Sequence, residues 1–278
     1  MTTLAICNHK GGTGKTTSTM NLAAAFGLSG SRVLVVDLDP QGFLTRMLGV
    51  SEPAAASSSL VLFGHEVDYD ALPIARLNTF DLIPASPALS SAMRRLNKPT
   101  DVLWLREFTD GVDSSYDLLI FDTAAAVTVY SLNAMAASGH VLIPVLPEYQ
   151  PVVGAEQTYQ TSMVLKKKLN PGMEVPRLIL TMVDGRKRNH YAYRQYLRDR
   201  YGERVLKTTI RTCTTLSVTL HDGLTVFESN PKARGSIDYA NAADEMICYL
   251  GLDAKKSANS AESRVQSFET LQTQGLSV

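Results

Sequence analysis

The chain has 278 residues, of which 45% are apolar and 19% are charged, and its formal net charge is zero. Such a composition is typical of a globular protein, and this length can bury one large core or two small ones. The first apolar run is too short for a signal peptide, and no stretch has the roughly 18 apolar residues of a transmembrane helix. We therefore expect a soluble protein. Three scattered cysteines (Cys7, Cys213 and Cys248) form no C-x-x-C pair, which argues against a disulfide framework or zinc site and fits a reduced, cytoplasmic compartment.

Short apolar runs alternate with longer amphipathic stretches along the chain. The predicted buried strands are Leu4–Cys7, Val33–Val36, Leu118–Phe121, Val141–Val145, Leu178–Met182 and Thr208–Ile210, and a hairpin is predicted over Ile74–Leu77 and Phe80–Ile83. The predicted helices are Thr16–Ser29, Val127–Ala137, Pro151–Leu169, Tyr191–Tyr201 and Gly235–Leu250. This alternation predicts an α/β fold, with a mostly parallel, twisted sheet of about seven to eight strands and helices on both faces.

The pattern predicts one folded domain followed by a tail. Residues 1–252 carry the alternating strands and helices, and Ser51–Ser59, rich in Ala and Ser, is expected to be a loop or linker. From residue 253 onward the apolar periodicity fades and polar residues dominate. We expect residues 253–278 to form a flexible C-terminal tail.

A glycine-rich segment joins the first predicted strand to the first predicted helix. Lys10 to Thr17 read K-G-G-T-G-K-T-T. A loop that enters a helix presents free backbone N–H groups and the positive end of the helix dipole to an anion, and glycines let that backbone approach phosphate oxygens closely. Lys15 can reach the β- and γ-phosphates of a nucleotide, and the Thr16 hydroxyl can ligate Mg²⁺. The alternative is a glycine-rich turn that merely connects two elements, but two lysines and two threonines in this context favour phosphate binding.

The segment departs from the usual pattern G-x-x-x-x-G-K-[ST]. His9 stands where that pattern has its first glycine, and a lysine, Lys10, follows it. In this form K-G-G-T-G-K-T-T resembles the deviant Walker A motif of the ParA/MinD ATPases, which are P-loop NTPase-like. Val35–Gly42 (V-V-D-L-D-P-Q-G), Leu142–Tyr149 (L-I-P-V-L-P-E-Y) and Thr181–Arg186 (T-M-V-D-G-R) resemble the ParA branch, so the likeness covers most of the chain. Because the loop begins at residue 10, we expect no helix-turn-helix domain before it, as in the Soj-like members.

The resemblance implies a set of nucleotide-binding residues and a dimer. In such proteins two ATP-bound subunits sandwich their nucleotides face to face. Lys15 would then act within its own subunit, while Lys10 would cross to the partner's phosphates. The expected ATP-binding residues are Lys10, Gly11, Gly12, Thr13, Gly14, Lys15, Thr16 and Thr17.

Three aspartates follow predicted strands at the sheet edge where ligands bind in α/β folds. Asp37 and Asp39 lie two residues apart after Val33–Val36, so their side chains point the same way. The alternative is a pair of loop-capping aspartates. The family resemblance assigns to Asp39 the orientation of the attacking water, and Asp37 is expected to support Mg²⁺ or the loop geometry. Asp122, after Leu118–Phe121, has the context of a Walker B acid, so the predicted metal residues are Thr16, Asp37 and Asp122.

Two positions depart from the family pattern. ParA proteins usually follow the Walker B aspartate with one or two prolines, whereas Asp122 is followed by Thr123 and three alanines. Family members also commonly read I-P-R-N-V-R near residue 210. Here Thr212 and Thr215 stand in place of the two arginines, and Arg211 is displaced by one position.

Positive charge is concentrated in one segment. Residues 166–211 hold thirteen Lys or Arg and four acids, a local charge of +9 that the rest of the chain balances with −9. This asymmetry is expected of a surface that binds a polyanion. The alternative is a solvated helix face whose lysines pair with nearby acids. The ParA resemblance favours DNA, which places the predicted DNA-binding residues at Arg186, Lys187, Arg188 and Arg211.

The resemblance therefore implies a partition ATPase. It would be a slow ATP hydrolase that uses Mg²⁺, dimerises on ATP, binds nucleoid DNA without sequence preference in the cytoplasm and is released by a ParB-like activator, so as to move a plasmid, a chromosome origin or another large cargo. A MinD-like membrane ATPase is the first alternative, but Ser263–Val278 has only Arg264 as a cation, so we do not expect membrane binding. The second alternative is an ordinary metabolic or metal-delivery enzyme on the same fold. An iron–sulfur reductase of this class would need paired cysteines at the dimer face, and the three scattered cysteines argue against it.

Overall fold

The structure, a computed structural model, describes residues 1–64, 66–96, 98–112 and 116–252. The predicted tail over 253–278 lies outside these residues. So does the segment Ser263–Val278 on which the membrane alternative depends. Within the described part of the chain, no helix is both long and apolar enough to cross a bilayer.

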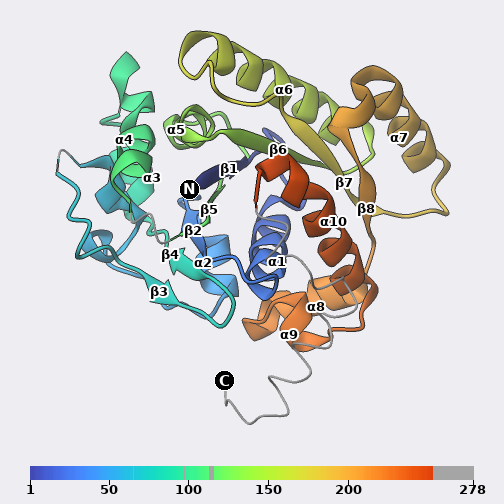
Figure 1. The fold of residues 1–278 in the computed structure, drawn as a ribbon, viewed down its shortest axis with the longest axis horizontal. Coiled ribbons are helices and arrows are strands. Elements are labelled where there is room, and N and C mark those ends of the chain that lie inside the picture. The colour runs from blue at the N-terminus through green and yellow to red at the C-terminus, as the bar shows by residue number, and fades with distance from the viewer. Residues whose placement is uncertain (65, 97, 113–115, 253–278) are drawn as a thin grey trace.

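An eight-stranded sheet forms the centre of the molecule (Figure 1). Its order is β3-β4-β2-β5-β1-β6-β7-β8, and every neighbouring pair is parallel except the hairpin β3–β4. The strands are β1 (Thr2–Ile6), β2 (Val33–Asp37), β3 (Ala75–Arg76), β4 (Asp81–Ile83), β5 (Leu118–Asp122), β6 (His140–Val145), β7 (Arg177–Val183) and β8 (Val205–Arg211). The predicted fold class, the hairpin and the eighth strand are confirmed.

Helices cover both faces of the sheet. The α-helices are α1 (Lys15–Leu28), α2 (Phe43–Met47), α3 (Ala88–Ala92), α4 (Trp104–Gly111), α5 (Val129–Ala137), α6 (Tyr149–Lys168), α7 (Arg188–Tyr201), α8 (Thr214–Asp222), α9 (Val226–Ser229) and α10 (Arg234–Leu250), and the 3₁₀ turns are η1 (Ala55–Ser57), η2 (Ser59–Phe63), η3 (Pro99–Val102) and η4 (Gly202–Arg204). Figure 1 shows α1 and α10 on one face and α5 and α6 on the other.

The core follows the two-residue period of the strands. In β5, Leu118 and Ile120 join the cluster under α1 and α10, whereas Leu119 and Phe121 join the cluster under α4, α5 and α6. Successive side chains of a strand point to opposite faces, so a strand covered on both sides is apolar throughout. This burial holds the ends of β1, β2 and β5 side by side, where the predicted aspartates lie.

Ser51–Ser59, predicted to be a loop, is partly ordered by buried serines. Residues 55–57 form η1, and both Ser58 and Ser59 are buried. The Ser59 hydroxyl donates to the carbonyl oxygen of Asp37 at 2.6 Å. The segment therefore packs against the end of β2 rather than linking separate units.

Candidate nucleotide site

The segment from Lys10 to Thr17 forms the end of the loop between β1 and α1 together with the first residues of α1. Gly12 and Gly14 adopt positive φ angles of 73° and 82°, which a side chain would strain. Gly14 is the N-cap of α1 and provides no side-chain cap, and the first turn holds no acid. The free N–H groups at the start of α1 are therefore available to an anion. The Lys15 ammonium lies within the loop, 3.2 Å from the carbonyl oxygen of Lys10.

Residues outside the motif hold this loop in place. The Asn8 side chain accepts from the Lys10 backbone N–H at 2.9 Å and donates to the carbonyl oxygen of Pro144 at 2.8 Å. The Thr158 hydroxyl accepts from the His9 backbone N–H, and the Thr181 hydroxyl donates to the carbonyl oxygen of Thr13. These contacts come from β6, α6 and β7, so the loop is shaped before any ligand binds. Sequence reasoning missed these three side chains because nothing local marks them.

Asp122 is connected directly to the first turns of α1. One of its carboxylate oxygens accepts from the Thr16 hydroxyl at 2.9 Å, and the other accepts from the Thr19 hydroxyl at 2.8 Å. Burial, together with the negative charge of Asp37, raises the pKa of Asp122 to about 7, although both threonine hydrogen bonds and Lys15 oppose the shift. A buried carboxyl whose ionised form is disfavoured, next to a hydroxyl, suits a site that takes up a cation. Thr16 and Asp122 therefore fit a magnesium ion.

Asp37 lies opposite Asp122 in the parallel register of β2 and β5. It is fully buried, and burial raises its pKa to about 6. One carboxylate oxygen accepts from the Asp39 backbone N–H, and the other accepts from the Thr45 backbone N–H and hydroxyl. Both oxygens thus hold the connection between β2 and α2. Of the two roles expected for Asp37, this geometry favours support of the loop.

Asp39 is half-buried on the same connection, and its carboxylate accepts fewer hydrogen bonds than that of Asp37. One of its carboxylate oxygens accepts from the Gln41 backbone N–H at 2.9 Å. Its negative charge raises the pKa of Lys15, but burial outweighs this effect and leaves the pKa of Lys15 below its usual value. The Asp39 carboxylate therefore interacts electrostatically with Lys15 of the phosphate loop.

A pocket of about 370 Å³ adjoins the loop. Gly14 and Thr17 form its floor, and its walls come from the ends of β7 and β8 and from α8 and α10, including Met182, Leu216 and Tyr239. Met182 has a φ of 50°, a strained angle for a residue with a side chain. We call this cavity the loop-side pocket. Its position beside the phosphate loop suits the nucleoside end of a nucleotide, and sequence reasoning did not identify it.

Three comparisons with known proteins agree with this geometry. The model of the AAA domain family matches residues 1–175. The chain is 35% identical to the chromosome-partitioning ATPase Soj of Thermus thermophilus over 88% of its length and 94% of that protein. It is 31% identical to the sporulation initiation inhibitor protein Soj of Bacillus subtilis, over 87% and 97%. The chain belongs to the ParA/MinD family of P-loop ATPases.

Solved structures agree with the family assignment. The crystal structure of cobyrinic acid a,c-diamide synthase from Mycobacterium smegmatis with bound ADP and magnesium is 29% identical, with a TM-score of 0.73 over 90% of this chain and 97% of that one. The apo McdA structure from Cyanothece has a TM-score of 0.78 at 22% identity, over 89% and 99% of the two chains. At that identity the second match shows the fold alone.

The loop after Asp122 lacks the prolines usual in the ParA family. Thr123 is buried, and its hydroxyl donates to the carbonyl oxygen of Ile6 at 2.9 Å. A hydrogen bond to β1 thus fixes the start of this loop where a proline ring would restrict it. Further along, a Cβ atom at Gly11 would lie 3.7 Å from the Ala125 side chain, so the alanine loop lies beside the phosphate loop.

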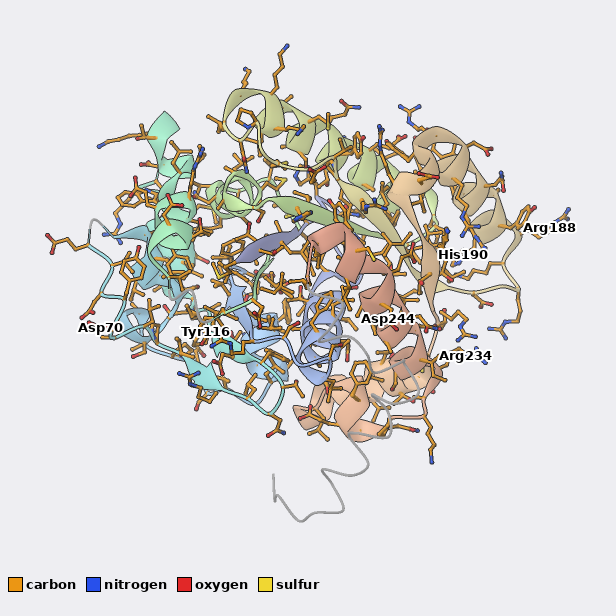
Figure 2. The ribbon with its side chains drawn as sticks, in the orientation of Figure 1. Asp70, Tyr116, Arg188, His190, Arg234 and Asp244 are labelled. Atoms are coloured by element: carbon orange, nitrogen blue, oxygen red, sulfur yellow. The ribbon has the colours of Figure 1, made fainter. Side chains whose placement is uncertain are left out.

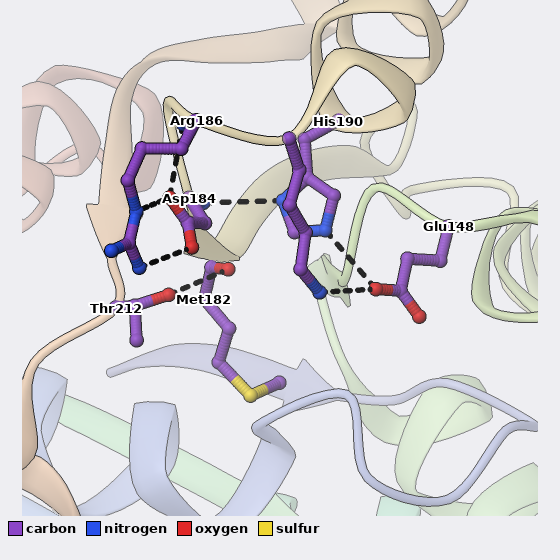
Figure 3. A network of polar contacts seen from close by, with 7 residues as sticks. Glu148, Met182, Asp184, Arg186, His190 and Thr212 are labelled. Carbon is purple, nitrogen blue, oxygen red and sulfur yellow. Dashed lines mark hydrogen bonds and ion pairs between the residues drawn. The ribbon is translucent and has the colours of Figure 1, made fainter.

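Three of the four predicted DNA-binding side chains are paired with acids. Arg186 forms two side-chain hydrogen bonds to Asp184, at 3.0 and 2.8 Å, and Lys187 pairs with Glu148 at 3.0 Å (Figure 3). Figure 3 also shows His190 between Asp184 and Glu148. Its Nδ1 accepts from the Asp184 backbone N–H, and its Nε2 contacts the same Glu148 oxygen at 3.1 Å.

The remaining two predicted residues differ from each other. Arg211 is paired with Asp238 through its guanidinium group, at 2.5 Å for the shortest contact. Arg188, exposed at the start of α7, projects outward (Figure 2) and forms no ion pair within the described residues. A cation that is paired with an acid of its own chain binds phosphate less readily. Arg188 is therefore the most available of the four for contact with DNA phosphates.

Proposed function

We propose that the protein is an ATPase that dimerises on ATP, binds DNA without sequence preference and positions a plasmid, a chromosome origin or another large cargo. The observation that carries this proposal is the contact of Thr16 with Asp122 at the start of α1. It joins a phosphate-binding helix N-terminus to a buried acid suited to Mg²⁺. ATP and Mg²⁺ are the cofactors that this site would take, and related proteins contain ADP and magnesium.

Each residue of the site has a proposed task. Lys15 and the loop N–H groups would hold the β- and γ-phosphates, while Thr16 and Asp122 would hold Mg²⁺. The metal would neutralise phosphate charge as ATP is hydrolysed to ADP and phosphate. Asp39 would orient the water for in-line attack, because one hydrogen bond holds its carboxylate to the β2–α2 connection whereas both oxygens of Asp37 are held there. Hydrolysis would be slow until a ParB-like activator binds.

Dimerisation is supported by apolar side chains around the phosphate loop. Phe43, Val127 and Tyr149 are 50%, 56% and 67% exposed, and they follow the carboxyl ends of β2, β5 and β6. Exposed apolar side chains at one edge of a sheet favour association. A second copy placed face to face would bury them and bring its Lys10 toward the bound phosphates.

The DNA proposal rests on the +9 charge of residues 166–211 and predicts a nucleoid-associated, cytoplasmic protein. The test is a salt titration of binding to two unrelated duplexes with ATP, with ADP and without nucleotide. We expect equal affinity for both duplexes, dependence on ATP and steep weakening by salt. Lys15→Ala is the control, since it should lose ATP binding and DNA binding together. Sequence-selective binding, or equal binding without nucleotide, would contradict the proposal.

A further inference from the structure

Thr19 lies one turn beyond Thr16 on α1, and its side chain is fully buried. Residues three positions apart on a helix lie on the same face, so the two hydroxyls can reach one partner. Thr16 donates to one carboxylate oxygen of Asp122 at 2.9 Å, and Thr19 donates to the other oxygen at 2.8 Å. One helix therefore holds both oxygens of a carboxylate whose backbone belongs to the central sheet.

The Thr19 hydroxyl has two acceptors within reach but only one hydrogen. Its oxygen lies 2.8 Å from the Asp122 carboxylate and 3.1 Å from the carbonyl oxygen of Lys15, four residues earlier in the helix. A bond to that carbonyl is the ordinary arrangement of a serine or threonine inside a helix. Ser29 shows it at the other end of α1, where its hydroxyl donates to the Ala25 carbonyl at 2.7 Å. The carboxylate lies nearer and accepts more strongly when ionised, so the Thr19 hydrogen then belongs to Asp122.

The surroundings of Asp122 make its orientation depend on these bonds. It is buried, and a second carboxyl, Asp37, lies opposite it in the register of β2 and β5. Like charges that lie close together in a protein interior repel each other. The segment after Asp122 has Thr123 and three alanines in place of prolines, and the Thr123 hydroxyl donates to the Ile6 carbonyl, which fixes the backbone of this segment. Among the described residues, the hydrogen bonds that orient the carboxylate itself come from α1.

This arrangement prepares Thr16 to ligate a metal. A hydroxyl that donates its hydrogen keeps both oxygen lone pairs free for a cation. The Asp122 carboxylate accepts the Thr16 hydrogen in its present rotation, and Thr19 holds that rotation at the second oxygen. We propose that Thr19 is a positioning residue of the magnesium site, a role that rests on the proposed function. It acts through Asp122 and Thr16 and sets the Mg²⁺ concentration at which ATP binds.

Loss of the Thr19 hydroxyl should weaken metal binding more than nucleotide binding. Thr19→Val removes the hydroxyl and keeps the β-branched shape of the side chain. Groups that orient metal ligands contribute about 10–100-fold to metal affinity, so this variant should need about tenfold more Mg²⁺ for half-maximal ATP binding. Lys15 and the N–H groups of the phosphate loop make their own contacts, so ATP binding without Mg²⁺ should stay at the wild-type level.

The test is a Mg²⁺ titration of binding to a fluorescent ATP analogue, measured by anisotropy and started in metal-free buffer. Mn²⁺ in place of Mg²⁺ gives a second readout, because the electron paramagnetic resonance signal of free Mn²⁺ decreases as the protein and nucleotide bind the ion. Thr19→Ser restores the hydroxyl and should recover most of the wild-type response. Ser29→Ala is the matched control, because it removes a buried hydroxyl from the same helix without touching Asp122. It should lower the Tm but leave the Mg²⁺ requirement unchanged.

A double-mutant cycle shows whether Thr19 acts through Asp122. In an Asp122→Asn background, Thr19→Val should change the Mg²⁺ requirement little further, because the carboxylate that Thr19 orients is already gone. Additive effects of the two substitutions would contradict the positioning role. Thr19→Ala, which favours the helix, should repeat the result of Thr19→Val and guards against a folding defect that valine alone would cause.

The remaining outcomes distinguish the role of Thr19 from the proposed function. If Thr19→Val binds the ATP analogue at the wild-type Mg²⁺ concentration, or if Thr19→Ser is impaired as strongly as Thr19→Val, the positioning role is wrong and the proposed function stands. If the wild type binds the ATP analogue with no response to Mg²⁺ or Mn²⁺, the proposed function and the role of Thr19 are both overturned.

Discussion

Thr16, in the first turn of α1, donates its hydroxyl hydrogen to Asp122, at the end of β5, across 2.9 Å. The two residues are 106 positions apart, and the parallel pairing of β1 with β5 brings them together. Because Thr19 holds the second carboxylate oxygen, Asp122 has a fixed orientation toward the phosphate loop. The cation site is therefore arranged by the fold before nucleotide arrives.

Asp122→Asn should remove a pH dependence of stability. The pKa of Asp122 is about 7 in the folded chain against an ordinary value of 3.8. Between these values the folded state keeps a proton that the unfolded state has lost, so stability falls as pH rises through this window. Without ligand, the wild-type Tm should drop by on the order of 5 °C between pH 5 and pH 8 relative to Asp122→Asn.

Mg²⁺–ATP supplies the companion measurement for the same variant. A metal needs the ionised carboxylate, so the stabilisation of the wild type by Mg²⁺–ATP should increase with pH. Asp122→Asn should lose this increase. If the Tm values of the two proteins changed with pH by the same amount, both with and without Mg²⁺–ATP, a role for Asp122 at the metal would be contradicted.

Asp39→Ala should separate ATP binding from hydrolysis. Among the described residues, the Asp39 carboxylate is hydrogen-bonded to the Gln41 backbone N–H of its own connection, so its loss should leave the phosphate loop intact. Turnover should fall by about 100-fold or more, as expected for removal of a water-orienting group. The ATP-bound dimer should in turn live longer, which gel filtration with ATP and Mg²⁺ would detect. A variant that binds ATP but stays monomeric would show that our division of roles is wrong.

Gly154→Ala tests how closely α6 approaches the phosphate loop. A Cβ atom at Gly154 would lie 2.7 Å from the Lys10 Cβ and 3.0 Å from the Asn8 side-chain oxygen. Replacing glycine by alanine stabilises an exposed helix interior by about 1 kcal/mol, but overpacking destabilises a protein by about 1–3 kcal/mol. We expect little or no gain in stability, and a loss of ATP-dependent dimerisation because Lys10 is displaced.

Gly172→Ala is the matched control for this substitution. A Cβ atom there would approach nothing closer than 3.7 Å, at the Asn170 side chain, and the position is exposed. It should dimerise as the wild type does. If the two variants dimerised to the same extent, the close approach of α6 to Lys10 would have no effect on dimerisation.

The apolar runs predicted the strands because a parallel sheet covered on both faces leaves no polar positions, as Leu118–Phe121 illustrates. The phosphate loop was equally predictable, since its glycines and lysines act locally. Asn8, Thr158 and Thr181 were not, because their roles depend on hydrogen bonds to residues brought near by the fold. Short helices such as α2 and α9 were not predicted, because a segment of five or fewer residues shows no periodicity. The pairing of Arg186 with Asp184 likewise needs coordinates to be seen.

We propose that ATP joins two copies of the chain through Lys10. The most direct measurement is the molar mass by light scattering of wild type and Lys10→Ala at saturating ATP and Mg²⁺, with ATP occupancy measured in the same samples. We predict that the wild type has twice the monomer mass, and that Lys10→Ala binds ATP but stays monomeric. A wild type that remains monomeric with ATP bound, or a Lys10→Ala variant that dimerises as the wild type does, would contradict the account.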